Sequence, residues 1–269
     1  MDCEHVRVDN YPLSGVPEML ERVRDHFSLY SAGLLLMAAA LSAACSSPAR
    51  PSAPTQEDPQ GPNTLTGAER AAGWRLLFDG QSTSGWRGFR QAGMPEGWKV
   101  IDGALTRDTG GGDVITTDRF SDFELALEWQ LAPAGNSGIM YRVSEAAALT
   151  FLSGPEMQVI DNAQNPDGGT AVTSAGACYA LYGPLRDVSR AAGSWNAVRL
   201  VATGSHIEHW LNGVKVVEYE LGSADWLARV QASMFRDVQT YGRETAGHIA
   251  LQDHGDRVAY RSIKIRSLP

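Results

Sequence analysis

The chain has 269 residues, and its 31 Asp and Glu outnumber its 23 Lys and Arg, which gives a formal net charge of −8. This acidic balance, without any run of Lys or Arg, excludes the basic surface that binding of nucleic acid requires. Cys3 and Cys45 lie in the N-terminal segment, so Cys178 is left without a partner for a disulfide. We interpret Cys178 as a small buried strand residue.

The N-terminal segment resembles the leader of an exported bacterial lipoprotein. Residues 32–44 form an apolar run of about 13 residues, the length of a signal-peptide core and too short to span a bilayer. Small residues then precede Cys45, the position at which such a leader is lipidated. We expect a leader over residues 1–45, a lipid anchor on Cys45 and a periplasmic protein held at the outer membrane. A plain secretory signal or an uncleaved apolar helix is the alternative.

Composition divides the rest of the chain into two parts. Residues 46–64 are rich in Pro, Ser, Gln and Gly and have no apolar period, which predicts a disordered tether. Residues 65–269 have the size of a single all-β domain. The tether and the domain therefore follow the leader in that order.

Strand patterns dominate the predicted domain. Residues 123–130 alternate apolar and polar side chains, and Asn212-Gly213 is the dipeptide that favours a tight hairpin turn, here between strands over 206–211 and 214–219. Further strands are expected at 197–202, 249–252 and 258–265, with short helices only at 66–72 and 225–232. This pattern predicts an all-β fold, a two-sheet antiparallel jelly roll.

The chemistry is expected to centre on the strand that begins at Glu156. Side chains alternate along a strand, so Glu156 and Gln158 point to one face while Met157 and Val159 point to the other. Asp161 is out of phase with that polar face. The result is a polar cluster on a sheet whose other face is apolar.

Eight short motifs then follow one another in an order that resembles a known family. They are LFDG with GW (77–86), WKVIDGAL (98–105), NSGIMYR (136–142), EMQVID (156–161), GSWN (193–196), HWLNG (209–213), QDHG (252–255) and YRSIKI (260–265). Together they resemble the 3-keto-disaccharide hydrolase domain family (DUF1080) over residues 73–268. The resemblance implies a concanavalin A-like jelly roll, often carried by exported lipoproteins. It also implies hydrolase or 1,2-lyase activity on sugars oxidised at C3.

A 3-keto group makes the C2 proton of a sugar acidic, so cleavage needs a base near C2, a group that stabilises the enolate oxygen and an acid for the leaving oxygen. We expect Glu156 and His254 to transfer the protons. Arg142, Gln158 and Asn136 would orient the substrate and stabilise the enolate. Because Gln158 cannot titrate, Glu156 has no second carboxylate on its strand face, which favours an oxidised sugar over ordinary glycoside hydrolysis.

Several of these residues also have a structural interpretation. Arg142 would either hold a substrate oxygen or pair with Glu156 and lower its pKa. Asp161 is a candidate substrate-binding residue, which would order Glu156 or bind a cation; the alternative is a turn-forming aspartate. Tyr141 and Tyr182 would contact the sugar or pack in the sandwich.

A divalent cation is possible, with Glu156, Asp161, His209 and His254 as candidate ligands, although their spacing matches no metal motif. His209 also fits a packed strand position, and His254 a turn. Two segments, 145–155 and 233–246, are expected to shape the rim of the cleft. The rival functions are a carbohydrate-binding module without turnover and a conventional endoglucanase.

Overall fold

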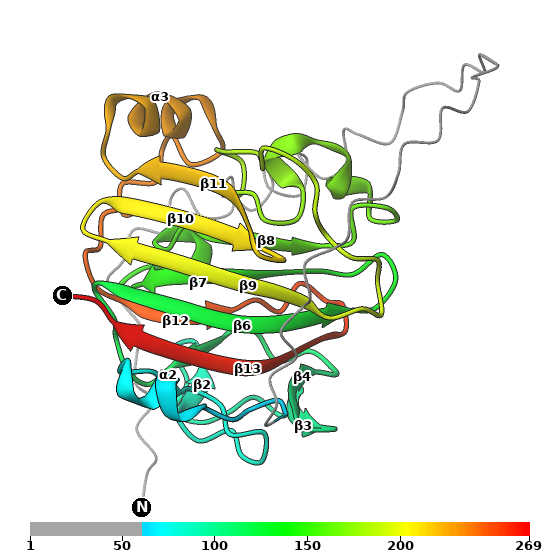
Figure 1. Cartoon of the computed structure of the whole chain (residues 1–269). Helices are drawn as coiled ribbons and strands as arrows, with labels where there is room; N and C mark the ends of the chain where they lie inside the picture. The colour runs from blue at the N-terminus through cyan, green and yellow to red at the C-terminus, as the bar shows by residue number, and fades with distance from the viewer. Residues whose placement is uncertain (1–60) are drawn as a thin grey trace, which may run out of the picture. The chain divides into compact units, whose positions relative to one another are not determined.

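The computed structural model describes residues 61–269 (Figure 1). The predicted leader, the lipidation site Cys45 and residues 46–60 of the predicted tether lie outside the described residues. Residues 61–64, assigned from composition to the tether, are attached to the domain. The Asn63 side chain donates to Gly103 O at 2.8 Å and accepts from Ser262 N at 2.8 Å. The domain therefore begins a few residues earlier than predicted.

Two antiparallel sheets form the domain, which confirms the predicted fold class. In Figure 1 sheet A faces the viewer and sheet B lies behind it. Sheet A contains, in spatial order, β11 (Val214–Glu220), β10 (His206–Leu211), β9 (Asn196–Thr203), β6 (Phe123–Leu131), β13 (Val258–Ser267), β4 (Ala104–Arg107) and β3 (Trp98–Ile101), with β1 (Arg75–Leu76) paired to β13. Sheet B contains β2 (Trp86–Gly88), β5 (Val114–Thr116), β12 (His248–Leu251), β7 (Asn136–Val143) and β8 (Glu156–Ile160).

The predicted alternation produces the apolar core between the sheets. Phe123, Leu125, Leu127 and Trp129 of β6 are buried there. The β10–β11 hairpin turns at Asn212, with φ 50°, and Gly213, with φ 80°, as its Asn-Gly dipeptide predicts. Cys178 is free and buried.

Helices are few and short. The helix α2 (Gly67–Ala71) begins at a capping box formed by Thr66 and Glu69, and α3 (Ala224–Ala232) begins at Ser223. Both predicted helices are confirmed. Single 3₁₀ turns occur at Thr150–Leu152, Pro166–Gly169 and Ala171–Thr173. Within residues 61–269, no helix combines the length and the apolar composition needed to cross a membrane.

The strand β8 is the last strand of sheet B, and a segment that follows it in the chain forms hydrogen bonds along the edge opposite β7. Gln158 N donates to Ala177 O at 3.0 Å, and Tyr179 N donates to Glu156 O at 3.0 Å. This pairing satisfies the backbone of β8, so the strand that carries Glu156 is not a free sheet edge.

Candidate functional site

Glu156 of β8 pairs with Met140 of β7, and its carboxyl group reaches diagonally over Gly138. Met157 pairs with Ile139, and Gln158 pairs with Gly138, so the polar side chains of β8 share the outer face of sheet B with Gly138. A Cβ atom added to Gly138 would lie 1.9 Å from Glu156 Oε1. Gly138 therefore leaves the space that the Glu156 carboxyl group occupies, which explains the glycine of the NSG motif.

The same face carries a row of residues that crosses three strands. Val114 of β5 pairs with Leu251 of β12, so Asp113 and Gln252 lie opposite each other one position further along. Gln252 N donates to Gly138 O at 3.0 Å. The row therefore runs from Asp113 through Gln252 to Gly138, where it meets the Glu156 carboxyl group.

Burial and a neighbouring charge raise the pKa of Glu156. Glu156 is only 5% exposed. Within residues 61–269, its side chain forms no ion pair and receives no hydrogen bond. Burial penalises the charged form, and the nearby Asp113 carboxylate adds repulsion, which together raise the pKa of Glu156 to about 8. Glu156 is therefore protonated at neutral pH and able to donate.

Asp113 is the carboxyl group that the sequence interpretation missed. Its oxygens accept hydrogen bonds from Thr150 Oγ1 and, at 2.8 Å, from Asp253 N. Burial raises its pKa, and the hydrogen bonds and the nearby His254 oppose that rise. The expectation that Glu156 stands without a second carboxylate is thus wrong for the site as a whole. The second acid directly precedes β5, which β12 and β7 separate from β8, and no motif indicates it.

The two predicted rim segments meet above this face. Thr150, in the first segment, contacts Asp113. Thr240, in the second segment, donates through Oγ1 to Leu152 O at 2.7 Å, and Gly242 N donates to Ser153 O at 2.8 Å. The first segment therefore reaches the site, and the second segment holds it in place.

Gln158 and Asn136 lie together on the outer face of sheet B. Gln158 Nε2 donates to Asn136 Oδ1 at 3.3 Å, and both residues are buried. The backbone of Asn136 is held by Asp256, whose Oδ2 accepts from Asn136 N at 3.0 Å. Gln158 leans from β8 toward β7 along the same diagonal as Glu156, so the two side chains are parallel neighbours.

His254 lies in the exposed loop after β12 and interacts electrostatically with Asp113. Asp253, beside it, fixes this loop: its carboxylate contacts Arg107 Nε at 2.6 Å and accepts from Gly112 N at 2.9 Å. Along the row, Glu156 is buried while Gln252 and Asp113 are half-buried, and His254 in the neighbouring loop is exposed.

Arg142 does not reach the Glu156 face. Its φ of 53° marks a bulge where the register of β7 with β12 shifts, so the expected alternation of side chains is broken. The guanidinium group donates to Ser121 O at 3.0 Å and lies 3.3 Å from Asp122 Oδ1. Both predicted roles, holding a substrate oxygen and pairing with Glu156, are therefore wrong.

Tyr141 and His209 belong to the core, as their structural interpretation predicts. Tyr141 Oη lies 3.1 Å from His209 Nε2 and also contacts Tyr219 Oη, and His209 Nδ1 lies 3.1 Å from Gly176 O. Burial lowers the pKa of His209 to about 4. The sugar-contact role predicted for Tyr141 is wrong because its side chain faces between the sheets.

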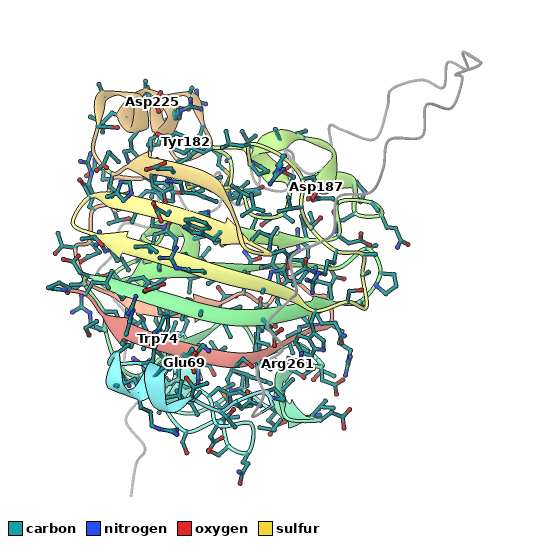
Figure 2. All side chains as sticks on the ribbon, in the orientation of Figure 1. Glu69, Trp74, Tyr182, Asp187, Asp225 and Arg261 are labelled. Carbon is teal, nitrogen blue, oxygen red and sulfur yellow. The ribbon has the colours of Figure 1, made fainter. Side chains whose placement is uncertain are left out.

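Tyr182 and Asp161 are also engaged elsewhere. Tyr182 stacks on Tyr219 at 4.9 Å between ring centroids and donates through Oη to Asp225 at 2.8 Å; Figure 2 shows Tyr182 and Asp225 beside α3. Asp161 accepts from Ala134 N at 2.9 Å and from Ala163 N at 3.1 Å. These contacts are those of a packed tyrosine and a turn-forming aspartate, in place of the predicted substrate-binding roles.

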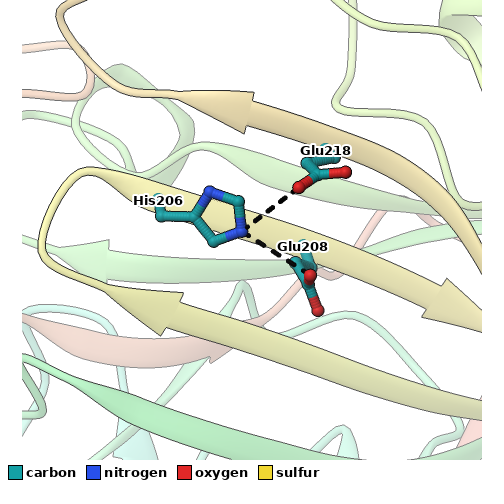
Figure 3. Close-up of side chains that lie close together, drawn as sticks. All are labelled: His206, Glu208 and Glu218. Atoms are coloured by element: carbon teal, nitrogen blue, oxygen red, sulfur yellow. Dashed lines mark ion pairs between the residues drawn. The ribbon is translucent and has the colours of Figure 1, made fainter.

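The four predicted metal ligands do not come together. Glu156 lies on the outer face, His209 in the core, and Asp161 in a turn. Across residues 61–269, only His206, Glu208 and Glu218 form a group of three side chains close enough to share an ion, and this group lies on sheet A (Figure 3). Lys215 Nζ already lies 2.6 Å from Glu218 and 3.1 Å from Glu208, so a cation occupies that position.

Comparisons with known proteins agree with the motifs. Residues 73–266 match the model of the 3-keto-alpha-glucoside-1,2-lyase-like domain. A 3-keto-disaccharide hydrolase of Bacteroides thetaiotaomicron is 30% identical over 230 residues, which cover 74% of this chain and 79% of that protein.

Two solved structures from Parabacteroides distasonis, both described as glycosyl hydrolases, share the fold. One has a TM-score of 0.73 at 33% identity and covers 78% of this chain and 100% of that one. The other has a TM-score of 0.58 at 26% identity and covers 72% and 99%. The chain therefore belongs to the 3-keto-alpha-glucoside-1,2-lyase-like domain family.

Proposed function

We propose that this protein is a carbohydrate-active enzyme that cleaves the glycosidic bond of 3-keto-disaccharides or 3-keto-glycosides. The observation that carries the proposal is the Glu156 carboxyl group, buried over Gly138 with its pKa raised to about 8. The similarity to a 3-keto-disaccharide hydrolase supports the substrate class.

The reaction that fits this site begins with removal of the C2 proton, which the neighbouring ketone makes acidic. The electron pair of the C2–H bond forms an enolate, and elimination then breaks the bond from C1 to the leaving oxygen. Glu156, protonated at neutral pH, donates its proton to that oxygen. Addition of water to the unsaturated keto-sugar completes hydrolysis, and release of that sugar before water adds gives the lyase outcome.

Incubation of the protein with 3-keto-trehalose in D₂O, followed by NMR, tests this proposal. We expect free glucose together with either a 3-keto-glucose deuterated at C2 or an accumulating unsaturated keto-sugar. Binding of the substrate without any product at any pH between 5 and 9 would contradict catalysis and favour a binding module.

A conventional glycosidase is the second candidate, because Asp113 supplies the second carboxyl group that such an enzyme requires. Parallel assays with trehalose and 3-keto-trehalose, and with a β-glucan, separate the two. We expect cleavage of the keto-sugar at least 100-fold faster than of its unoxidised counterpart. Faster cleavage of an unoxidised substrate would favour the second candidate.

We also propose that the mature protein is anchored by a lipid on Cys45 at the outer membrane. The apolar run before Cys45 and the polar tether after it support this. Metabolic labelling with an alkyne fatty acid should mark the wild-type protein and not the Cys45→Ala variant. Equal labelling of both would remove Cys45 as the anchor.

A further inference from the structure

The outer face of sheet B holds two carboxyl groups in different surroundings, and we propose that they divide the proton transfers between them. Asp113 is the general base that removes the C2 proton, and Glu156 is the acid that protonates the leaving oxygen. This inference rests on the proposed function and adds a residue that none of the sequence motifs contains.

The backbone register places the two groups on the same face of sheet B, on either side of Gln252. Asp113 lies opposite Gln252, Gln252 bonds to Gly138, and the Glu156 carboxyl group lies over Gly138. Strands are spaced about 4.8 Å apart, so Gly138 and Asp113 are separated by two spacings, or roughly 10 Å. A sugar ring above Gln252 would have one carboxyl group on each side.

Hydrogen bonding decides which group is the base. Asp113 accepts hydrogen bonds from Thr150 and from the backbone of Asp253, and such donors stabilise a carboxylate. Glu156 receives none from the described residues and lies in a drier position. Because their surroundings favour the ionised form of one acid and the protonated form of the other, we assign Asp113 as the base and Glu156 as the acid.

The remaining ionisable groups around the pair do not compete for the base role. Cys178, Tyr179, Tyr241 and Tyr260 interact electrostatically with Glu156, and burial raises the pKa of each, so all four are neutral at pH 7.

The groups near Asp113 are Asp253 and His254. Asp253 is paired with Arg107 and receives backbone hydrogen bonds, which hold its pKa below the ordinary value. His254 is exposed and is not part of the row from Asp113 to Glu156.

Gln252 gives an independent indication that a ligand binds between the two carboxyl groups. Its Oε1 is one of three buried side-chain atoms among the described residues that lack a hydrogen-bond partner. An amide oxygen left without a donor in a buried position is costly. A sugar hydroxyl held between the two acids would donate to it, which also orients the ring.

The proton transfers balance in this arrangement. Asp113 takes the proton from C2, the electron pair moves to form the C1–C2 double bond, and the leaving oxygen departs with the proton of Glu156. In hydrolysis, the Glu156 carboxylate then takes a proton from the water that adds at C1, and Asp113 returns its proton to C2. Both carboxyl groups end in their starting states.

Asp113→Asn, Asp113→Glu and Asp118→Asn test the inference. Asp118→Asn is the matched control, because Asp118 follows the other end of β5 and is exposed. We expect a bell-shaped pH dependence of kcat for the wild type, with its basic limb near pH 8. Asp113→Asn should lower kcat about 1,000-fold, change KM less than threefold and abolish the acidic limb, whereas Asp113→Glu should restore that limb. The control should match the wild type.

A substrate-free measurement separates this inference from the proposed function. Glutamate side chains labelled with ¹³C allow the Glu156 carboxyl group to be titrated by NMR. Asp113→Asn should lower the pKa of Glu156 from about 8 because the repelling charge is gone. An unchanged titration would overturn the carboxyl pair whether or not any substrate is cleaved.

Activity assays of the variants also test whether Asp113 is the base. If the wild type cleaves 3-keto-trehalose and Asp113→Asn retains more than a tenth of kcat with an unchanged pH profile, Asp113 is not the base. If His254→Gln instead loses activity 1,000-fold and Asp113→Asn does not, the base is His254. A wild type that cleaves no keto-sugar contradicts the proposed function, and the NMR titration still decides the carboxyl pair.

Discussion

On the outer face of sheet A, acidic side chains are paired with cations. Glu124 contacts both Arg199 and Arg266, and Glu208 lies 3.1 Å from Lys215. On the outer face of sheet B, Glu156 has no cation partner among the described residues and has Asp113 as its charged neighbour. The two faces of one sandwich thus place the same chemical group in opposite electrostatic surroundings.

This difference separates structural acids from reactive ones. On sheet A, hydrogen bonds lower the pKa of Glu208 and of Glu220, and Glu218 pairs with Lys215; Figure 3 shows Glu208 and Glu218 beside His206. On sheet B burial without a cation raises the pKa of Glu156 to about 8, so the proton becomes available near neutral pH. The protonation of an acid therefore depends on its partners, and the number of acids on a face does not predict it.

The largest effect is expected from Glu156→Gln, which removes the titrating proton and keeps the shape of the side chain. We expect kcat on 3-keto-trehalose to fall about 1,000-fold while the circular dichroism spectrum stays unchanged. Glu218→Gln on sheet A is the matched control and should retain full activity. Activity of Glu156→Gln close to the wild-type rate would remove Glu156 from the mechanism.

The same substitution should change how stability depends on pH. The pKa of Glu156 is raised in the folded state, so the folded protein holds a proton that the unfolded chain releases between about pH 4.5 and 8. Stability should therefore fall as pH rises through that range, by at most about 5 kcal/mol. Urea unfolding at pH 5 and pH 8 should show this slope in the wild type and a smaller one in Glu156→Gln.

Gly138→Ala tests whether the Glu156 carboxyl group needs a residue without a side chain at position 138. The new Cβ would lie 1.9 Å from Glu156 Oε1, so the carboxyl group must move. We expect kcat to fall about 100-fold and stability to fall by about 1–3 kcal/mol. Gly93→Ala, where nothing lies within 4 Å, is the control. Unchanged activity in Gly138→Ala would show that the position of Glu156 is not critical.

Arg142→Met distinguishes a structural cation from a catalytic one. Loss of the bonds to Ser121 and Asp122 should lower stability by about 2–4 kcal/mol, because buried polar groups lose their partner. Per folded molecule, kcat should change less than threefold. A large loss of kcat with normal stability would restore Arg142 to the site.

The smallest effect is expected on sheet A from Glu220→Gln. Glu220 lies 2.6 Å from His206 Nδ1 and is the main cause of the raised pKa of His206. The wild-type pair stabilises the fold below the ordinary pKa of histidine and loses that contribution as pH rises through the raised pKa. Because the pair is exposed, Glu220→Gln should cost less than about 1 kcal/mol at pH 5.5 and nothing at pH 9, as chemical denaturation can measure. A cost that is equal at both pH values would contradict this linkage.

Local patterns in the sequence determined most of the fold. The alternation in β6, the Asn-Gly turn between β10 and β11 and the capping residue Thr66 each specify their element through contacts with near neighbours. The strand carrying Glu156 and Gln158 was predictable for the same reason, because side chains alternate along any strand. Family motifs extended this to the class of enzyme.

Only the tertiary structure decided which side chains share a site. The bulge at Arg142 turns its guanidinium group away from Glu156. No local sequence pattern predicts a positive φ at this arginine. Asp113 comes to Glu156 through the pairing of β5, β12 and β7, which joins residues distant in the chain. A sequence specifies strands through short-range periodicity, whereas the surroundings of an acid, and with them its pKa, depend on long-range pairing and burial.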